Sequence, residues 1–151
     1  MENAGSSPAE GTDKTLKTMD KFEYFGLFLN SKTRDRLLKT LKSSPYNTIL
    51  DTADRIFLDH CTLLHKSQSC TKDILDYLND RIGKKFIITI TGIGVSDKAM
   101  AFKVHRDIYC ANRISHITIA TFKRGKPKDS NDILLWTPIK PIGIETTLDK
   151  V

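Results

Sequence analysis

The sequence predicts a single α+β domain whose sheets are mostly antiparallel. Three observations support this fold class. With 151 residues, the chain is long enough to bury one hydrophobic core but short for two. Its first half alternates segments of strand and helix periodicity. Its second half contains strand-forming segments separated by turns, and this order of elements is typical of α+β folds.

The ordered part of the chain is predicted to begin at Phe22. Residues 1–17 are small, polar and without hydrophobic periodicity, which indicates a disordered leader or a remnant of an expression vector. Residues 22–151 are therefore expected to form the single domain.

Two strand–helix units are predicted in the first half. In the first, a buried strand over residues 24–29 leads to a helix that Asn30 or Ser31 can cap. In the second, a strand over residues 56–64 leads to a helix over residues 71–82. Apolar residues recur at helical spacing in both helices, namely Leu37, Leu38 and Leu41, then Ile74, Leu75, Leu78 and Ile82.

The second half is predicted to be rich in strands. Residues 85–93 and 99–104 flank a short turn and form a hairpin. A strand over residues 114–122 follows. A basic loop, a short helix and a final strand are then expected over residues 123–129, 130–136 and 139–148.

Composition and charge narrow the function classes. The chain has no run of about 18–20 apolar residues, as a membrane helix needs, and no signal-peptide layout, so an intracellular protein is expected. Its three cysteines fit neither a zinc pattern nor a disulfide framework. A net charge of +6 favours an anionic partner, although many basic proteins bind no nucleic acid.

Two predicted strands carry the same pattern, His-x-Thr. The first pairs His60 with Thr62, and the second pairs His116 with Thr118. Because side chains alternate between the two faces of a strand, each histidine shares a face with its threonine, while the apolar residues beside them face the core. Each strand therefore presents one imidazole and one hydroxyl on its front.

This arrangement suits the in-line attack of water on a cyclic phosphodiester. One neutral imidazole can accept a proton from the water, while an imidazolium across the phosphorus donates a proton to the departing ribose oxygen. Histidine can fill both roles because its reference pKa lies near 6.5, and each role typically contributes about 10²- to 10⁴-fold in rate. The threonine hydroxyls can bind the non-bridging phosphate oxygens, where charge develops.

Two alternatives to a catalytic role for the motifs stay open at this point. Both histidines could be surface residues on unrelated strands, although the two copies use two of only four histidines in the chain. Histidines are also common metal ligands, but neither motif brings the extra carboxylate or cysteine that a zinc or two-metal centre requires. No metal and no cofactor are therefore expected.

At these residues the sequence resembles the two-histidine (2H) phosphoesterase superfamily, whose signature is a pair of His-x-Thr or His-x-Ser motifs. Within it, the chain is most similar to the C-terminal cyclic phosphodiesterase domain of fungal and plant tRNA ligases. Four segments within residues 22–151 carry this resemblance. They are YFGLFL at 24–29, HCTLLH at 60–65, HITIAT at 116–121 and GKPKDSNDIL at 125–134.

The resemblance implies a two-lobed fold in which two mostly antiparallel sheets form a central cleft, with helices outside. It implies that His60, Thr62, His116 and Thr118 hydrolyse a 2′,3′-cyclic phosphate at an RNA end, such as a tRNA exon, to a 3′-OH and a 2′-phosphate. By the same analogy His116 is the base and His60 is the acid. The expected protein is a monomeric enzyme of tRNA splicing or RNA repair, which could be fused to kinase and ligase domains in a longer parent chain.

Six residues around the second motif are candidates for substrate binding. The basic ones could meet RNA phosphates, although a solvated charge run explains them equally well. The resemblance suggests a serine and an asparagine as contacts of the scissile phosphate, with helix capping as the alternative. A phenylalanine could stack a base, although core packing explains it better. The six are Lys123, Arg124, Lys126, Ser130, Asn131 and Phe122.

Two rival functions stay open. The same motif residues could serve a 2H enzyme that acts on 2′,5′-oligoadenylate or another cyclic nucleotide. Alternatively, the chain could be a catalytically inactive RNA-binding module with vestigial motifs. The intact threonines argue against this second possibility.

Overall fold

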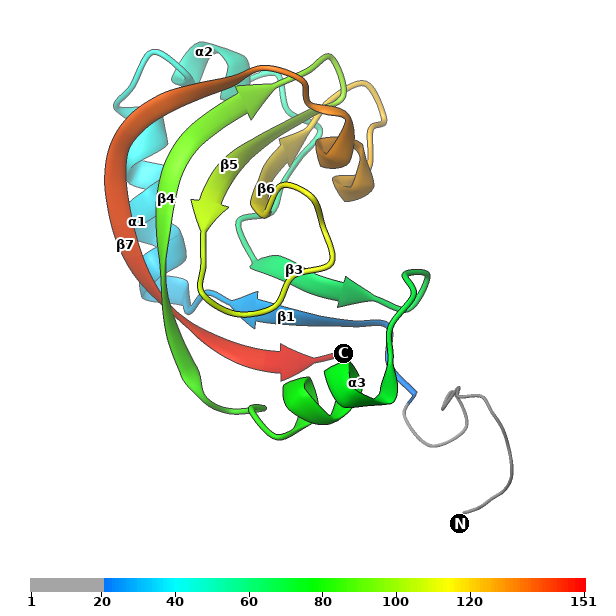
Figure 1. Cartoon of the computed structure of the whole chain (residues 1–151). Helices are drawn as coiled ribbons and strands as arrows, with labels where there is room; N and C mark the ends of the chain where they lie inside the picture. The colour runs from blue at the N-terminus through cyan, green and yellow to red at the C-terminus, as the bar shows by residue number, and fades with distance from the viewer. Residues whose placement is uncertain (1–20) are drawn as a thin grey trace.

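The structure, a computed structural model, describes residues 21–151, so the predicted leader at residues 1–17 lies outside the described residues. The strands are β1 (Tyr24–Phe28), β2 (Arg55–Ile56), β3 (His60–His65), β4 (Lys85–Val95), β5 (Ala99–His105), β6 (His116–Thr121) and β7 (Trp136–Lys150). The helices are α1 (Ser31–Lys42), α2 (Asn47–Leu50), α3 (Lys72–Asn79) and the 3₁₀ helix η1 (Pro127–Asp132). Figure 1 shows how these elements are arranged.

The described strands form one antiparallel sheet that closes into a barrel. The hydrogen-bonded order is β2-β6-β3-β1-β7-β4-β5, and β5 pairs in turn with β6. The ring therefore contains six strands, with β2 attached to β6. The predicted α+β fold with two sheets around a cleft and helices outside is wrong, because the described chain is a mostly-sheet barrel with only 23% helix.

Shared strands explain why the two halves close into one sheet. β7 pairs with β1 through residues 147–150 and with β4 through residues 136–147. At about 3.4 Å per residue, its 15 residues can span about 50 Å, enough to run along both halves (Figure 1). On the other side of the ring, β6 pairs with both β3 and β5. In a fold of two separate sheets, each strand would pair only with strands of its own sheet. Here β7 and β6 each pair with strands of both halves, so the halves form one sheet.

The predicted helix starts are confirmed by their caps. The side chain of Asn30 accepts a hydrogen bond from the Thr33 N–H at 2.8 Å at the start of α1. The Thr71 hydroxyl accepts one from the Ile74 N–H at 3.3 Å at the start of α3. These caps satisfy backbone donors that have no partner within their own helix.

Two predicted elements differ from the structure. The expected strand over residues 56–64 is broken between β2 and β3, where Leu58 adopts a left-handed φ of 52°. The expected helix over residues 130–136 is also wrong. Pro127 starts the 3₁₀ helix earlier, as its fixed φ favours, and Trp136 already belongs to β7, where it pairs with Gly94.

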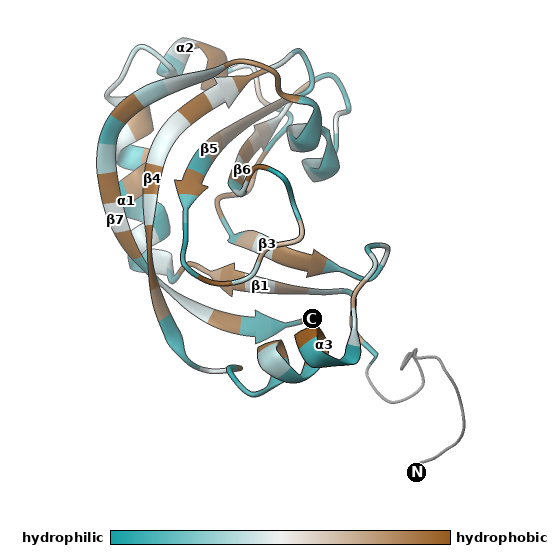
Figure 2. Cartoon of the chain, viewed as in Figure 1, coloured by the Kyte–Doolittle hydropathy of each residue, from teal (hydrophilic) through white to brown (hydrophobic). Residues whose placement is uncertain are grey.

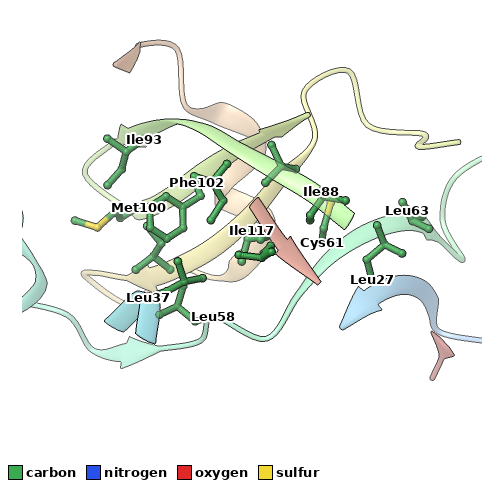
Figure 3. Packing of buried hydrophobic residues seen from close by; sticks show 14 of the residues in the cluster. Leu27, Leu37, Leu58, Cys61, Leu63, Ile88, Ile93, Met100, Phe102 and Ile117 are labelled. Carbon is green, nitrogen blue, oxygen red and sulfur yellow. The ribbon is translucent and has the colours of Figure 1, made fainter. Parts of the chain in front are cut away.

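The main hydrophobic core lies between the strands and helices α1, α2 and α3, and a small second cluster joins Ala99, Ala101 and Ile133. Figure 3 shows Leu37 of α1 near Leu58 and Met100. Hydrophobic and hydrophilic segments alternate along β7 in Figure 2, whereas η1 is hydrophilic throughout. The alternation predicted for the motif strands is confirmed, because Cys61, Leu63, Ile117 and Ile119 are all fully buried.

None of the helices within residues 21–151 has the length and apolar character that crossing a membrane requires.

Candidate functional site

The strands that carry the two motifs, β3 and β6, pair antiparallel at Cys61 and Ile117. Both residues are fully buried in the core. Successive side chains on a strand point to opposite faces, so the residues on either side of this pair face away from the core. The pairing therefore turns both motifs toward the same face of the sheet.

This register brings the four motif residues together. Continuing it by one residue in each direction places His60 beside Thr118 and Thr62 beside His116. Directly opposed residues in an antiparallel pair have Cα atoms about 4.5–5.5 Å apart. All four line one cavity of about 540 Å³, a volume within the range of about 300–1,000 Å³ that small-ligand sites occupy.

An aromatic cradle on β1 holds the ring of His60. Tyr24 stacks on it with ring centres 4.7 Å apart and planes 17° apart, and Phe28 lies 5.1 Å away at 32°. Between them on the same face of β1 lies Gly26, where a Cβ atom would approach the His60 Cδ2 to 3.3 Å. The missing side chain at Gly26 thus gives the imidazole room against the strand.

A backbone hydrogen bond sets the orientation of His116, which is only 8% exposed. Its Nδ1 lies 3.0 Å from the carbonyl oxygen of Ile114. Because a carbonyl oxygen only accepts, Nδ1 must carry the hydrogen, and in the neutral ring Nε2 is left with the free lone pair. Burial lowers the pKa of His116 from 6.5, and the hydrogen bond to Ile114 partly offsets this effect. The arrangement suits a proton acceptor.

The environment of His60 differs in its charges. Burial lowers its pKa from 6.5, the carboxylate of Asp59 opposes this effect, and His116 lowers the pKa further. Its Nδ1 is shielded from solvent and has no hydrogen-bond partner within residues 21–151. The pKa of His60 therefore depends on the charge of His116. Of the two, His60 has the neighbouring carboxylate that favours its protonated form.

Ser130 supports the hydroxyl of Thr118. The two hydroxyl oxygens lie 2.9 Å apart, and the Thr118 hydroxyl is also 3.4 Å from the carbonyl oxygen of Pro127. Ser130 is 1% exposed and does not line the cavity around the motifs. Ser130 therefore contacts Thr118 and not the cavity, and this contact ties the Thr118 hydroxyl to η1.

The other predicted binding residues are distributed unevenly. Asn131 lines the cavity, whereas Lys123, Arg124 and Lys126 are not among its lining residues. Lys123 and Arg124 adopt left-handed φ angles of 49° and 62° in an exposed turn. Phe122 is 6% exposed and belongs to the hydrophobic core, as the packing alternative predicted.

Sequence reasoning missed several residues of the cavity wall. Tyr24 could have been found from the alternation Tyr-x-Gly-x-Phe on the first strand. His65 was not expected, because its strand parity is opposite to that of His60, yet it lines the cavity. Gln68 and Asn112 join through a 2.9 Å hydrogen bond between two loops, a contact that no local pattern indicates.

The motif side chains at this site can carry out acid–base catalysis. The imidazoles and hydroxyls of both motifs line one cavity, together with the imidazole of His65. Within residues 21–151, no three histidine, cysteine, aspartate or glutamate side chains lie together in a group that could hold a metal ion.

Of the comparisons with known proteins, one identifies the family of the domain and another shows its fold. A family model described as the fungal tRNA ligase phosphodiesterase domain matches residues 2–140. A solved structure described as a fungal RNA kinase is similar, with a TM-score of 0.61 and 15% sequence identity over 89% of this chain. The match covers 46% of that solved chain, and at this identity it shows the fold alone. No curated protein matches the sequence significantly.

Proposed function

The chain belongs to the fungal tRNA ligase phosphodiesterase domain family, and on that premise we propose that it opens RNA 2′,3′-cyclic phosphate ends by two-histidine acid–base catalysis. The family's activity is that of a cyclic phosphodiesterase that heals RNA ends in tRNA splicing. The observation that carries the proposal is the pairing of β3 with β6, which gathers His60, Thr62, His116 and Thr118 on the wall of one cavity.

His116 acts as the general base. Its Nδ1–H is held by the Ile114 carbonyl, so Nε2 is free to accept a proton from the attacking water. The lowered pKa keeps the ring neutral at neutral pH, which is the form that a base requires. As the proton leaves, the water oxygen forms its bond to phosphorus.

His60 acts as the general acid. The neighbouring Asp59 carboxylate favours its protonated form, and an anionic phosphate in the cavity does so as well. The imidazolium gives its proton to the ribose O3′ as the bond from phosphorus to O3′ breaks. The products are a 3′-OH and a 2′-phosphate. The choice of O3′ as the leaving oxygen follows the family, because the near-symmetric placement of the two histidines allows either oxygen.

The two threonines bind the phosphate. Their hydroxyls can donate to the non-bridging oxygens, on which negative charge grows in the transition state. Thr118 is preoriented by Ser130 at 2.9 Å, so less ordering is needed when substrate binds. Removing one such preorganised donor typically costs about 10²- to 10³-fold in rate.

RNA is the proposed partner, and the parent protein is proposed to be larger. The net charge of +6 supports binding to a polyanion. The similar solved chain is a fungal RNA kinase of which this chain matches 46%. That proportion supports a parent chain in which a kinase accompanies the phosphodiesterase domain.

Substitution of the two histidines tests the mechanism. His60→Ala and His116→Ala are each expected to lower kcat by at least about 10²-fold on RNA that ends in a 2′,3′-cyclic phosphate. His105→Ala, at an exposed histidine outside the cavity, is the matched control and should retain full activity. Near-wild-type rates in either site variant would remove the acid–base pair.

The product and the substrate class are measured in the same experiment. Chromatography against authentic 2′- and 3′-monophosphates should find only the 2′-phosphate, and a dominant 3′-phosphate would contradict O3′ as the leaving oxygen. Parallel assays on 2′,5′-oligoadenylate test the rival substrate. Faster turnover of that substrate would reassign the site to a different phosphodiester.

A further inference from the structure

A second cavity, of about 300 Å³, adjoins the catalytic one. The loop between β5 and β6, which arches beside β3 in Figure 1, supplies part of its wall. The turn after β3, the start of β6, η1 with the residue after it, and the start of β7 supply the rest. Four residues line both cavities, namely Gln68, Asn112, His116 and Asn131. A ligand in the second cavity would therefore lie next to one in the first. We propose that the second cavity is the subsite for the nucleotide that precedes the cyclic-phosphate end, an inference that rests on the proposed function.

The two cavities differ in the chemistry of their walls. The catalytic cavity contains the motif residues and the aromatic side chains of Tyr24 and Phe57, which offer faces on which a terminal base can stack. The second cavity has mainly polar groups, including Arg113 and Ser130. Polar and cationic groups suit the ribose and phosphate of the next nucleotide. The terminal nucleotide thus belongs in the first cavity and its neighbour in the second.

Trp136 forms a rigid wall of the second cavity. It pairs with Gly94 across the β4–β7 ladder, and a Cβ atom at Gly94 would lie only 2.7 Å from the Trp136 Cε3. The indole therefore lies directly against the glycine backbone. Its Nε1–H is shielded from solvent and has no hydrogen-bond partner within residues 21–151. A ligand in this cavity would therefore meet the indole ring of Trp136 and not its N–H.

Arg113 supplies the charge. Its side chain is exposed and lines the second cavity, beside the Asn112 that borders both cavities. A guanidinium binds phosphate oxygens with two parallel hydrogen bonds. The phosphate that joins the last two nucleotides would lie at the boundary between the cavities, within reach of this group. A mononucleotide has no such phosphate, so it cannot use the subsite.

The chain contains a single tryptophan, so the fluorescence of Trp136 reports on this cavity directly. The wild-type protein is titrated with two compounds that correspond to products of the proposed reaction and are not turned over. One is adenosine 2′-monophosphate, and the other is the dinucleotide adenylyl-(3′→5′)-adenosine with a 2′-phosphate on its 3′-terminal ribose. The dinucleotide is expected to bind about tenfold more tightly and to change the emission of Trp136 more strongly. Equal affinities and equal emission changes would overturn the proposal.

Arg113→Gln is expected to remove most of the tenfold advantage in affinity of the dinucleotide. The matched control is Arg36→Gln, at an exposed arginine on α1, which should keep this advantage. Equal weakening of both ligands by Arg113→Gln would also overturn the subsite. The assay needs no turnover, so its result is separate from the proposed function. A dinucleotide advantage without cyclic-phosphate hydrolysis would contradict only the function, and failure of both nucleotides to bind would contradict only the subsite.

Discussion

Replacing Gly26 by alanine is expected to slow catalysis without unfolding the protein. The new Cβ atom would lie 3.2 Å from the carbonyl oxygen of Cys61 and 3.3 Å from Cδ2 of His60. Ordinary contacts between such atoms are about 3.5–4.0 Å. Either the imidazole or the strand must therefore move by about 0.3 Å.

The size of the effect follows from this displacement. A misplacement of about 1 Å can cost about 10²-fold in rate, so about 0.3 Å predicts a fourfold loss of kcat. Two contributions to the free energy of unfolding oppose each other. Overpacking destabilises the fold by about 1–3 kcal/mol, whereas alanine in place of glycine stabilises a strand by about 0.5–1 kcal/mol. The net loss in the free energy of unfolding is about 1 kcal/mol.

The assay compares Gly26→Ala with Gly143→Ala. Gly143 also lies in a strand, but a Cβ atom there would meet nothing within 4 Å. The control should therefore keep the wild-type kcat on cyclic-phosphate-ended RNA and gain up to about 1 kcal/mol in urea unfolding. A wild-type kcat in Gly26→Ala would refute the reasoning, because the position of the His60 ring would then not depend on the bare backbone of β1.

Three further outcomes are expected. Burial lowers the pKa of both His60 and His116 below 6.5, so each ring loses its proton at lower pH and the singly protonated pair is most abundant on the acidic side. The profile of kcat/KM against pH should be bell-shaped with its optimum below about 6.5, and an optimum above about 7.5 would contradict this. Ser130→Ala should lower kcat/KM several-fold and the free energy of unfolding, measured in urea, by about 1 kcal/mol, because the Thr118 hydroxyl loses a buried partner; unchanged kinetics would show that Thr118 needs no support. Turnover should persist in excess EDTA, and a loss that zinc or magnesium restores would indicate a metal site.

The motif residues could be found from the sequence because their arrangement is local. Strand alternation alone puts His60 with Thr62, and His116 with Thr118, on one face of their strands. What brings the two strands together is the pairing of Cys61 with Ile117, a contact between residues far apart in the chain. No single-strand pattern encodes that register.

The fold class was wrong because barrel closure depends on strand length. The sequence predicts a final strand over residues 139–148, which leaves out Pro138. Proline cannot donate a hydrogen bond to a sheet ladder. In the structure β7 begins at Trp136, and its first half pairs with β4 and not with β1. Among the strands of residues 21–151, none pairs with the other edge of that half, an arrangement in which proline is tolerated. The three extra residues at its start extend the pairing with β4 as far as Gly94.

The position of β7 between β1 and β4 also constrains how the polypeptide folds. Phe28 near one end of the chain pairs with Thr147 near the other, so the ring cannot close until the last strand has been synthesised. Loop-closure entropy opposes such distant pairings, and proteins dominated by them fold slowly. Until β7 arrives, the strand edges of β1 and β4 are unpaired in the nascent chain. Those edges are the surfaces on which a chaperone, or another copy of the chain, would act first.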